Sequence, residues 1–254
     1  MNTVVKSAER VLRTFEYFAE RQQPVKVNEV SRDLAIPQSS ASQLLHTLVK
    51  LGYLHYDRAQ RSFAPTLRVS VLGSWLVQQE NDSQSPLRMM QIVRRITGDA
   101  VALGLQNNIH ALYISVLAAT GPSGFYMKPG SLRPLCRSAI GLALLLDKTN
   151  DEIDLLVRRI NAEANPQEGR DDANSVIRTL DESRRLGYVV TRGTATPDAG
   201  VVAVPLPSVE AQPRMAIGIG APLTRIEKYA DSYGRLLRDI TTNNWQPAHS
   251  YNFS

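Results

Sequence analysis

Cysteine is almost absent from this chain of 254 residues. The one cysteine, Cys136, cannot form a disulfide within the chain. That usage is typical of proteins that work in a reducing cytoplasm, where thiols stay free. We therefore expect Cys136 to be a small buried side chain rather than a structural cross-link.

Long apolar runs and metal-binding patterns are missing as well. No stretch approaches the ~18 consecutive apolar residues of a membrane helix. Charged residues interrupt the first residues of the chain, so no secretory signal is expected there. The four histidines, His46, His55, His110 and His249, show no spacing typical of a zinc site. The sequence predicts a cytoplasmic protein with no membrane association, no metal and no cofactor.

The positive charge is unevenly distributed. The net charge of the whole chain is +5, but the first 78 residues hold ten Lys or Arg and only six Asp or Glu. Most of the surplus therefore lies in the first third. A local surplus of this kind favours contact with phosphate groups and binding that weakens with salt.

A helix-turn-helix is predicted from residues 27 to 51. Val27, Val30 and Leu34 repeat at helical spacing, and Pro37 ends that helix and suits the first turn of the next. The second helix should bury the stripe Ala41, Leu44, Leu45, Leu48 and Leu51, with Gly52 as a left-handed cap.

The opposite face of that second helix is polar but carries no acid between Gln38 and Lys50. A solvent-exposed face normally contains glutamates, whereas short hydrogen-bonding side chains suit base edges and phosphates. A hairpin then follows, in which residues 53–56 pair with 61–64 and basic residues lie at the tip. The residues predicted to contact double-stranded DNA are Gln38, Ser39, Ser40, Ser42, Gln43, His46, Arg58 and Arg61. The alternative is a small helical domain whose polar face contacts nothing.

The remainder of the chain alternates between strands and helices. Helices are expected at 86–97, 138–146, 149–164, 172–186 and 224–241, the third and fifth opening with the capping boxes Thr149–Glu152 and Thr224–Glu227. Strands are expected at 99–106, 109–117, 125–128, 188–191, 201–206 and 215–220. This order indicates an α+β domain with an antiparallel sheet. We place the DNA-binding domain at 1–78, including a helical stretch at 66–79, the linker at 79–85 and the second domain at 86–254.

Several stretches together resemble the IclR family of bacterial transcriptional regulators over nearly the whole chain. They are SAERVLRTFEYF, VNEVSRDLAIPQSSASQLLHTLVKLGYL, RPLCRSAIGLALL, LGYVVTRG, GVVAVPLP and AIGIGAPLTRI. The resemblance implies an N-terminal winged helix, a linker helix and a C-terminal effector-binding domain similar to GAF domains. It also implies a ligand-responsive regulator that assembles as a homodimer or a dimer of dimers.

The chain departs from the family pattern in both domains. Gln38 and Gln43 stand where the family often has Lys and Arg, and Leu142 stands where it commonly has Lys. Polar pocket positions of the family align with small or apolar residues here, which implies an effector with a bulkier, more apolar body. The expected effector-binding residues are Leu103, Met127, Ser138, Ala139, Ile140, Thr191, Arg192, Ala203, Gly218 and Gly220.

The chemistry of the second domain leaves alternatives open. The backbone N–H groups of Ala139 and Ile140, with Ser138 or the arginines 133, 137 and 192, can capture an anionic end of an effector. The same residues are also explained as an ordinary helix cap with solvated arginines. Cys136 or Ser138 as a catalytic nucleophile would need a base within reach, and no motif ties His110 to either. We therefore expect a regulator and not an enzyme, with a GAF-like enzyme fused to a winged helix as the alternative.

Overall fold

The computed structural model describes residues 5–72, 85–121, 127–163, 169–194, 196–208, 213–242, 251 and 253. The chain divides into two compact units, Met1–Gln79 and Glu80–Ser254. Each unit has a hydrophobic core of its own and is described separately below.

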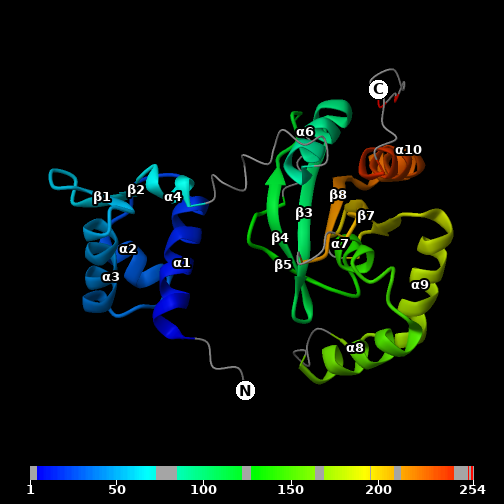
Figure 1. Ribbon diagram of the computed structural model, residues 1–254, viewed down its shortest axis with the longest axis horizontal. Coiled ribbons are helices and arrows are strands. Elements are labelled where there is room, and N and C mark those ends of the chain that lie inside the picture. Colours follow the sequence, from blue (N-terminus) through cyan, green and yellow to red (C-terminus); the bar gives the residue numbers. More distant parts are fainter. Residues whose placement is uncertain are drawn as a thin grey trace. The chain divides into compact units, whose positions relative to one another are not determined.

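The first unit is a winged helix-turn-helix (Figure 1). Its elements are α1 (Lys6–Arg21), α2 (Val27–Asp33), α3 (Gln38–Lys50), β1 (Leu54–Asp57), β2 (Ser62–Pro65) and α4 (Arg68–Val71). The core between them holds Val30 and Leu45, which are fully buried, together with Phe18 of α1 and Phe63 of the hairpin. Val25 forms a bridge to Phe63 and so attaches a third short segment to the hairpin.

One prediction for the first unit needs correction. Leu51 is 51% exposed rather than buried, because α3 ends at Lys50 and the following residues turn away from the apolar stripe. Gly52 does take the left-handed conformation, with φ of 80°. In the stretch expected to be helical from 66 to 79, only α4 is described, and Trp75 and Leu76 lie outside the described residues.

The second unit is built on a six-stranded antiparallel sheet in the order β5-β4-β3-β8-β7-β6. Its strands are β3 (Ala100–Asn107), β4 (His110–Leu117), β5 (Leu132–Pro134), β6 (Val189–Arg192), β7 (Ala199–Pro205) and β8 (Met215–Pro222). Its helices are α6 (Pro86–Thr97), α7 (Ala139–Ala143), α8 (Asn150–Glu163), α9 (Ala173–Leu186) and α10 (Leu223–Thr241). The predicted α+β class with an antiparallel sheet is confirmed.

Local corrections concern strand β5 and the last helix cap. The sequence does not predict β5, and Met127 and Lys128, the described part of the expected strand 125–128, are not in a strand. The Thr149–Glu152 capping box is present, with each residue accepting a backbone N–H of the other. Pro222 is the N-cap of α10, where no side chain caps the helix, so the predicted Thr224–Glu227 box is wrong.

Both faces of the sheet are covered by helices. On one face, α6 and α10 pack over Val101, Leu103, Ile217 and Ile219. On the other, α7, α8 and α9 pack over Ala102, Ala203 and Val189 with their neighbours. Because side chains alternate along a strand, β3, β7 and β8 contribute to both cores, which explains their nearly continuous apolar sequences.

Helix α7 lies unusually close to the sheet. A Cβ atom at Gly104 would meet Ile140 at 2.7 Å, and a Cβ at Gly141 would meet the carbonyl oxygen of Leu135 at 2.2 Å. Only glycine fits at such contacts, since real Cβ atoms do not approach other heavy atoms this closely. The packing of α7 therefore depends on Gly104 where the helix meets the sheet and on Gly141 where it meets the Leu135 backbone just before the helix.

On the opposite face of the sheet, the buried carboxylate of Asp99 ties helix α10 to the sheet. Asp99, 3% exposed, accepts hydrogen bonds from Arg225 through both carboxylate oxygens at 3.1 Å. It also accepts one from the Tyr233 hydroxyl at 2.5 Å. Arg225 donates to the carbonyl oxygen of Phe253 as well, and the Phe253 ring stacks on Tyr233 with centroids 5.0 Å apart. The start of β3, helix α10 and a residue near the C-terminus are thus fastened at one point.

Candidate functional site

The candidate DNA-binding surface is the polar face of α3. Gln38, Ser39 and Gln43 are exposed, and Ser40 and Ser42 are partly exposed, while Ala41, Leu45 and Leu48 are buried on the opposite side. The structure therefore brings the predicted polar residues together on one face of one helix. No acidic residue occurs in the first turn of α3, so the positive end of the helix dipole remains available to phosphate.

His46 has a second role besides facing solvent. Its ring meets the rings of Tyr56 and Phe63 edge-on, with centroids 5.4 and 5.3 Å away. Tyr56 and Phe63 lie opposite each other on β1 and β2. His46 therefore braces α3 against the hairpin and fixes the angle between the two.

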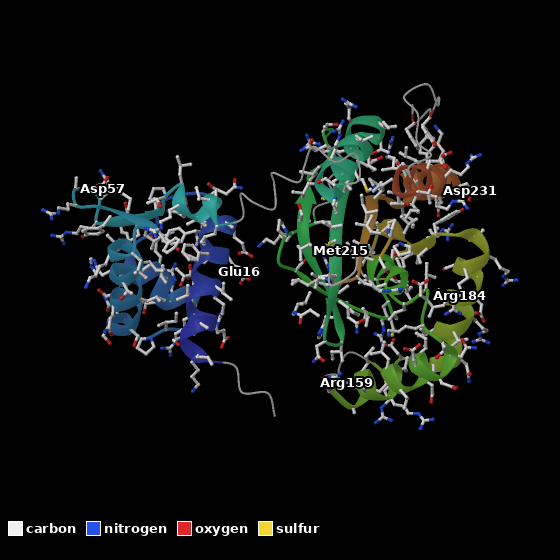
Figure 2. All side chains as sticks on the ribbon, in the orientation of Figure 1. Glu16, Asp57, Arg159, Arg184, Met215 and Asp231 are labelled. Carbon is white, nitrogen blue, oxygen red and sulfur yellow. The ribbon has the colours of Figure 1, made fainter. Side chains whose placement is uncertain are left out.

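The hairpin has a turn stabilised by a carboxylate. One oxygen of Asp57 accepts the backbone N–H groups of Ala59 at 2.8 Å and Gln60 at 3.1 Å. Figure 2 labels Asp57 at the outer end of the hairpin. Arg58 and Arg61 are both exposed, and Arg61 has a φ of 51° within the turn, so the paired strand begins at Ser62, one residue later than predicted.

Helix α1 is tied to the helix-turn-helix by Asp33. This carboxylate accepts from the Tyr17 hydroxyl at 2.7 Å and from Arg21 at 2.6 Å. Its hydrogen bonds with Arg32, Tyr17 and Arg21 hold its pKa well below the ordinary value. The carboxylate consequently stays charged at neutral pH and keeps α2 in place beneath α3.

A small cavity lies in the second unit beside the β6–β7 hairpin. Its volume is about 20 Å³, and its walls are Tyr113, Met127, Arg133, Thr191, Thr194, Thr196, Ala199, Gly200 and Val201. A space of that size admits about one water molecule. An organic effector therefore requires the walls to move apart.

The walls combine one cation, an aromatic ring and several hydroxyl groups. The Arg133 guanidinium lies 6.0 Å from the centre of the Tyr113 ring. Burial raises the pKa of the Tyr113 hydroxyl, so that group is neutral at pH 7. The Thr191 hydroxyl donates to the Val201 carbonyl over a long 3.5 Å, and the Thr194 hydroxyl donates to the Arg137 carbonyl at 2.9 Å. These groups suit a ligand with an anionic end and a polar substituent.

Of the ten expected effector residues, Met127 and Thr191 line this cavity. Arg192 is exposed and lies outside it. Leu103 belongs to the core under α6 and α10, on the opposite face of the sheet, because its side chain alternates with those of Ala102 and Gly104. Arg137 is already engaged, since it forms an ion pair with Asp171 at 2.5 Å and donates to the Gly169 carbonyl.

The expectation of open space at Gly218 is wrong. A Cβ there would lie 3.2 Å from Ile140 and 3.3 Å from Ala203, so these side chains already fill the region. Ala139 and Ile140 are fully buried, and Gly220 is buried in the central strand β8. The Ser138 hydroxyl accepts the Gly141 N–H at 3.2 Å and serves as the N-cap of α7.

Thr194, Thr196 and Gly200 line the cavity but were not expected from the sequence. The two threonines belong to the segment from Thr191 to Thr196, in which hydroxyl residues occur on both sides of a turn. Gly200 follows in β7. Such a hairpin tip is ordinarily interpreted as solvent-exposed. The strand order places β3 and β8 between this hairpin and β4, which carries Tyr113, so the sequence gives no local sign that the two line one cavity.

The nucleophile alternative lacks support in the geometry. Burial raises the pKa of the Cys136 thiol to about 12, whereas a nucleophilic cysteine needs a lowered pKa. Ser138 is only 2% exposed, and its hydroxyl oxygen accepts the capping hydrogen bond from the Gly141 N–H. Among the described residues, no group of three His, Cys, Asp or Glu side chains is placed to hold a metal ion, and no helix is long and apolar enough to cross a membrane.

Comparison with known proteins matches both units to one family. The IclR helix-turn-helix domain matches residues 7–58, and the C-terminal domain of the bacterial transcriptional regulator IclR matches residues 77–243. This chain belongs to the IclR family. It is an IclR-type DNA-binding transcriptional regulator.

Individual members of the IclR family are distant in sequence. The Escherichia coli regulator KdgR is 22% identical over 167 residues, which span 66% of this chain and 64% of KdgR. The Escherichia coli regulator XynR is 20% identical over 224 residues, 88% of this chain and 89% of XynR. An IclR homologue from Microbacterium hydrocarbonoxydans, crystallised with 4-hydroxybenzoate, shares the fold with a TM-score of 0.69 at 21% identity, covering 93% of this chain and 98% of that one.

The environment of Cys136 predicts an unreactive thiol. With its pKa raised to about 12, the thiolate fraction near pH 8 falls roughly a thousandfold below that of an ordinary cysteine. We expect Ellman's reagent to label the native protein very slowly and the guanidinium-unfolded protein at once, with one thiol per chain. Rapid stoichiometric labelling of the native protein would contradict the buried position.

Proposed function

We propose that this regulator reads paired half-sites in double-stranded DNA through the polar face of α3 and that a small organic acid alters its affinity for them. The observation that supports the DNA part most directly is the acid-free polar face opposite the leucine stripe of α3. In this proposal, Gln38, Ser39, Ser40, Ser42, Gln43 and His46 face the major groove. Arg58 and Arg61 on the hairpin contact the backbone or the minor groove.

Substitutions in α3 and in the hairpin should affect DNA binding differently, because base contacts specify sequence and phosphate contacts do not. Gln43 is exposed in the middle of the α3 face, so Gln43→Ala should weaken the preference at one base position by ~1–3 kcal/mol. Arg61→Gly should weaken binding to all sequences alike and reduce the salt dependence by about one phosphate contact. Glycine is chosen because the φ of 51° at Arg61 suits it.

Fluorescence anisotropy with a set of single-base operator variants, at several salt concentrations, measures both effects. Arg61→Lys is the matched control and should retain most of the affinity. An unchanged base preference in Gln43→Ala would remove Gln43 from the groove. A change of base preference in Arg61→Gly would move the hairpin from the backbone to a base edge.

For the effector, we propose a small organic acid with an apolar or aromatic body, bound where Arg133, Tyr113 and the threonines of the β6–β7 hairpin converge. Arg133 is the cation of this cavity and can pair with a carboxylate in a bidentate manner. Tyr113 and Met127 offer apolar walls to the body. The complex of the Microbacterium homologue with 4-hydroxybenzoate supports this class of ligand.

Replacing Arg133 by methionine preserves length and removes the charge. We expect Arg133→Met to weaken 4-hydroxybenzoate binding by about tenfold or more, since a charge-assisted hydrogen bond contributes ~1.5–3 kcal/mol. The control is Arg192→Met, an exposed arginine one residue from Thr191 that does not line the cavity. Calorimetry that showed equal affinities in the two variants would place the effector elsewhere.

Assembly into dimers or dimers of dimers is also part of the proposal. One winged helix covers a half-site that is too short for specificity in a genome, so two copies must act together. Exposed apolar residues at the end of the first unit support association, since Leu67, Val71 and Leu72 are 86%, 62% and 59% exposed.

Light scattering at micromolar concentration tests this directly, because the chain has a mass of 28.1 kDa. We expect a mass of at least two chains, and a partial shift to the monomer when Leu67 and Leu72 are both replaced by serine. A monomer at all concentrations, with and without operator DNA, would contradict the proposed assembly.

A further inference from the structure

A second, larger hollow lies on the outer side of α6. It is an open groove of about 780 Å³ between this helix and the end of β4. Its lining residues are Arg88, Gln91, Ile92, Arg94, Arg95, Leu117 and Thr120. The volume falls in the range of small-molecule sites, which is about 300–1,000 Å³. It is far larger than the cavity beside the β6–β7 hairpin and shares no lining residue with it.

The charge of the groove is of one sign. Its charged lining residues are three arginines, with no acid among them. Within the described part of the chain, no ion pair or hydrogen bond joins these guanidinium groups to another residue. The cations are therefore gathered on one surface without an anion to balance them.

The position of Arg88 is not explained by the helix itself. Cations near the C-terminal end of a helix are favoured by its dipole, which accounts for Arg94 and Arg95 in the last turn of α6. Arg88 lies in the first turn, where the dipole disfavours a cation, and that turn contains no acid. A bound anion would offset both the dipole and the repulsion among the arginines.

The spacing of the lining residues limits the shape of that anion. Arg88, Ile92 and Arg95 follow one another at helical spacing on one face of α6. At 1.5 Å per residue, the backbones of Arg88 and Arg95 are about 10 Å apart. Ile92 lies between these two arginines along α6, and Leu117 at the end of β4 adds a second apolar lining residue. A ligand that matches this pattern has two anionic ends and an apolar middle.

A second copy of the same surface fits poorly, since it would place arginines opposite arginines. A DNA backbone fits less well, because its deoxyribose rings offer little apolar surface to Ile92 and Leu117 compared with a hydrocarbon chain. We propose that the α6 groove binds an extended organic dianion, such as a medium-chain dicarboxylate, at a site separate from the effector cavity. Arg88 binds one carboxylate, Arg95 with Arg94 binds the other, and the hydrocarbon chain lies against Ile92 and Leu117.

Calorimetry on the full-length chain with octanedioate tests the site, with octanoate and butanedioate as comparison probes. Octanedioate should bind saturably and at least about tenfold more tightly than either comparison probe, because only it spans both ends. The double variant Arg88→Gln/Arg95→Gln should lose at least about tenfold in affinity for octanedioate. The charge-matched control Arg158→Gln/Arg178→Gln, on α8 and α9 away from the groove, should bind as the parent does.

The variant Arg133→Met separates this site from the effector cavity. It should leave octanedioate binding unchanged, whatever its effect on 4-hydroxybenzoate. The proposal is overturned if octanedioate does not saturate the parent protein at millimolar concentration, or if both double variants lose affinity equally. It is also overturned if the groove variant changes only the mass in solution or only the affinity for DNA, since the groove would then contact a second copy or the operator.

Discussion

The close packing of α7 against the sheet determines where a ligand can enter the second unit. Gly104 and Gly218 on the strands allow Ile140 of α7 to lie directly on the sheet, and Gly141 allows α7 to lie against the Leu135 backbone that precedes it. The centre of the sheet is consequently filled with protein atoms. A small cavity remains beside the β6–β7 hairpin, where Thr191, Val201, Tyr113 and Met127 are among the lining residues. The cavity proposed for the effector therefore lies beside the β6–β7 hairpin, and no residue of α7 lines it.

The packing of α7 on the sheet also explains why the sequence predicts the helices better than it predicts the residues of the candidate site. Amphipathic spacing and caps predict α3, α6, α8 and α9 to within a residue or two, because these signals are local. Glycines in β8 indicate close approach, but they do not show whether a ligand or a helix approaches. In this structure it is Ile140 of α7 that occupies the space at Gly218. Leu103 illustrates a related limit, since apolar residues on a strand covered on both faces do not reveal which face they take.

The first unit was more predictable because most of its candidate surface lies on one helix, α3. The apolar stripe and the polar face of α3 are both visible in the sequence, and each defines the other. What the sequence does not show is that His46 is shared between the exposed face and the hairpin. Its ring packs on Tyr56 and Phe63, so the orientation of the hairpin relative to α3 is set by a residue of the surface that we propose to face DNA.

The strand order has a consequence for how the chain folds as it is synthesised. Strand β3 pairs with β8 in the middle of the sheet, and Asp99, just before β3, accepts a hydrogen bond from Tyr233 of α10, 134 residues further along the chain. The hairpin of β3 and β4 emerges early and keeps one edge unpaired until β8 and α10 follow. Pairings between such distant segments close slowly, and an open strand edge is a site of aggregation during the wait. Chaperone binding during synthesis would accordingly be strongest after β4 and end once α10 has been made.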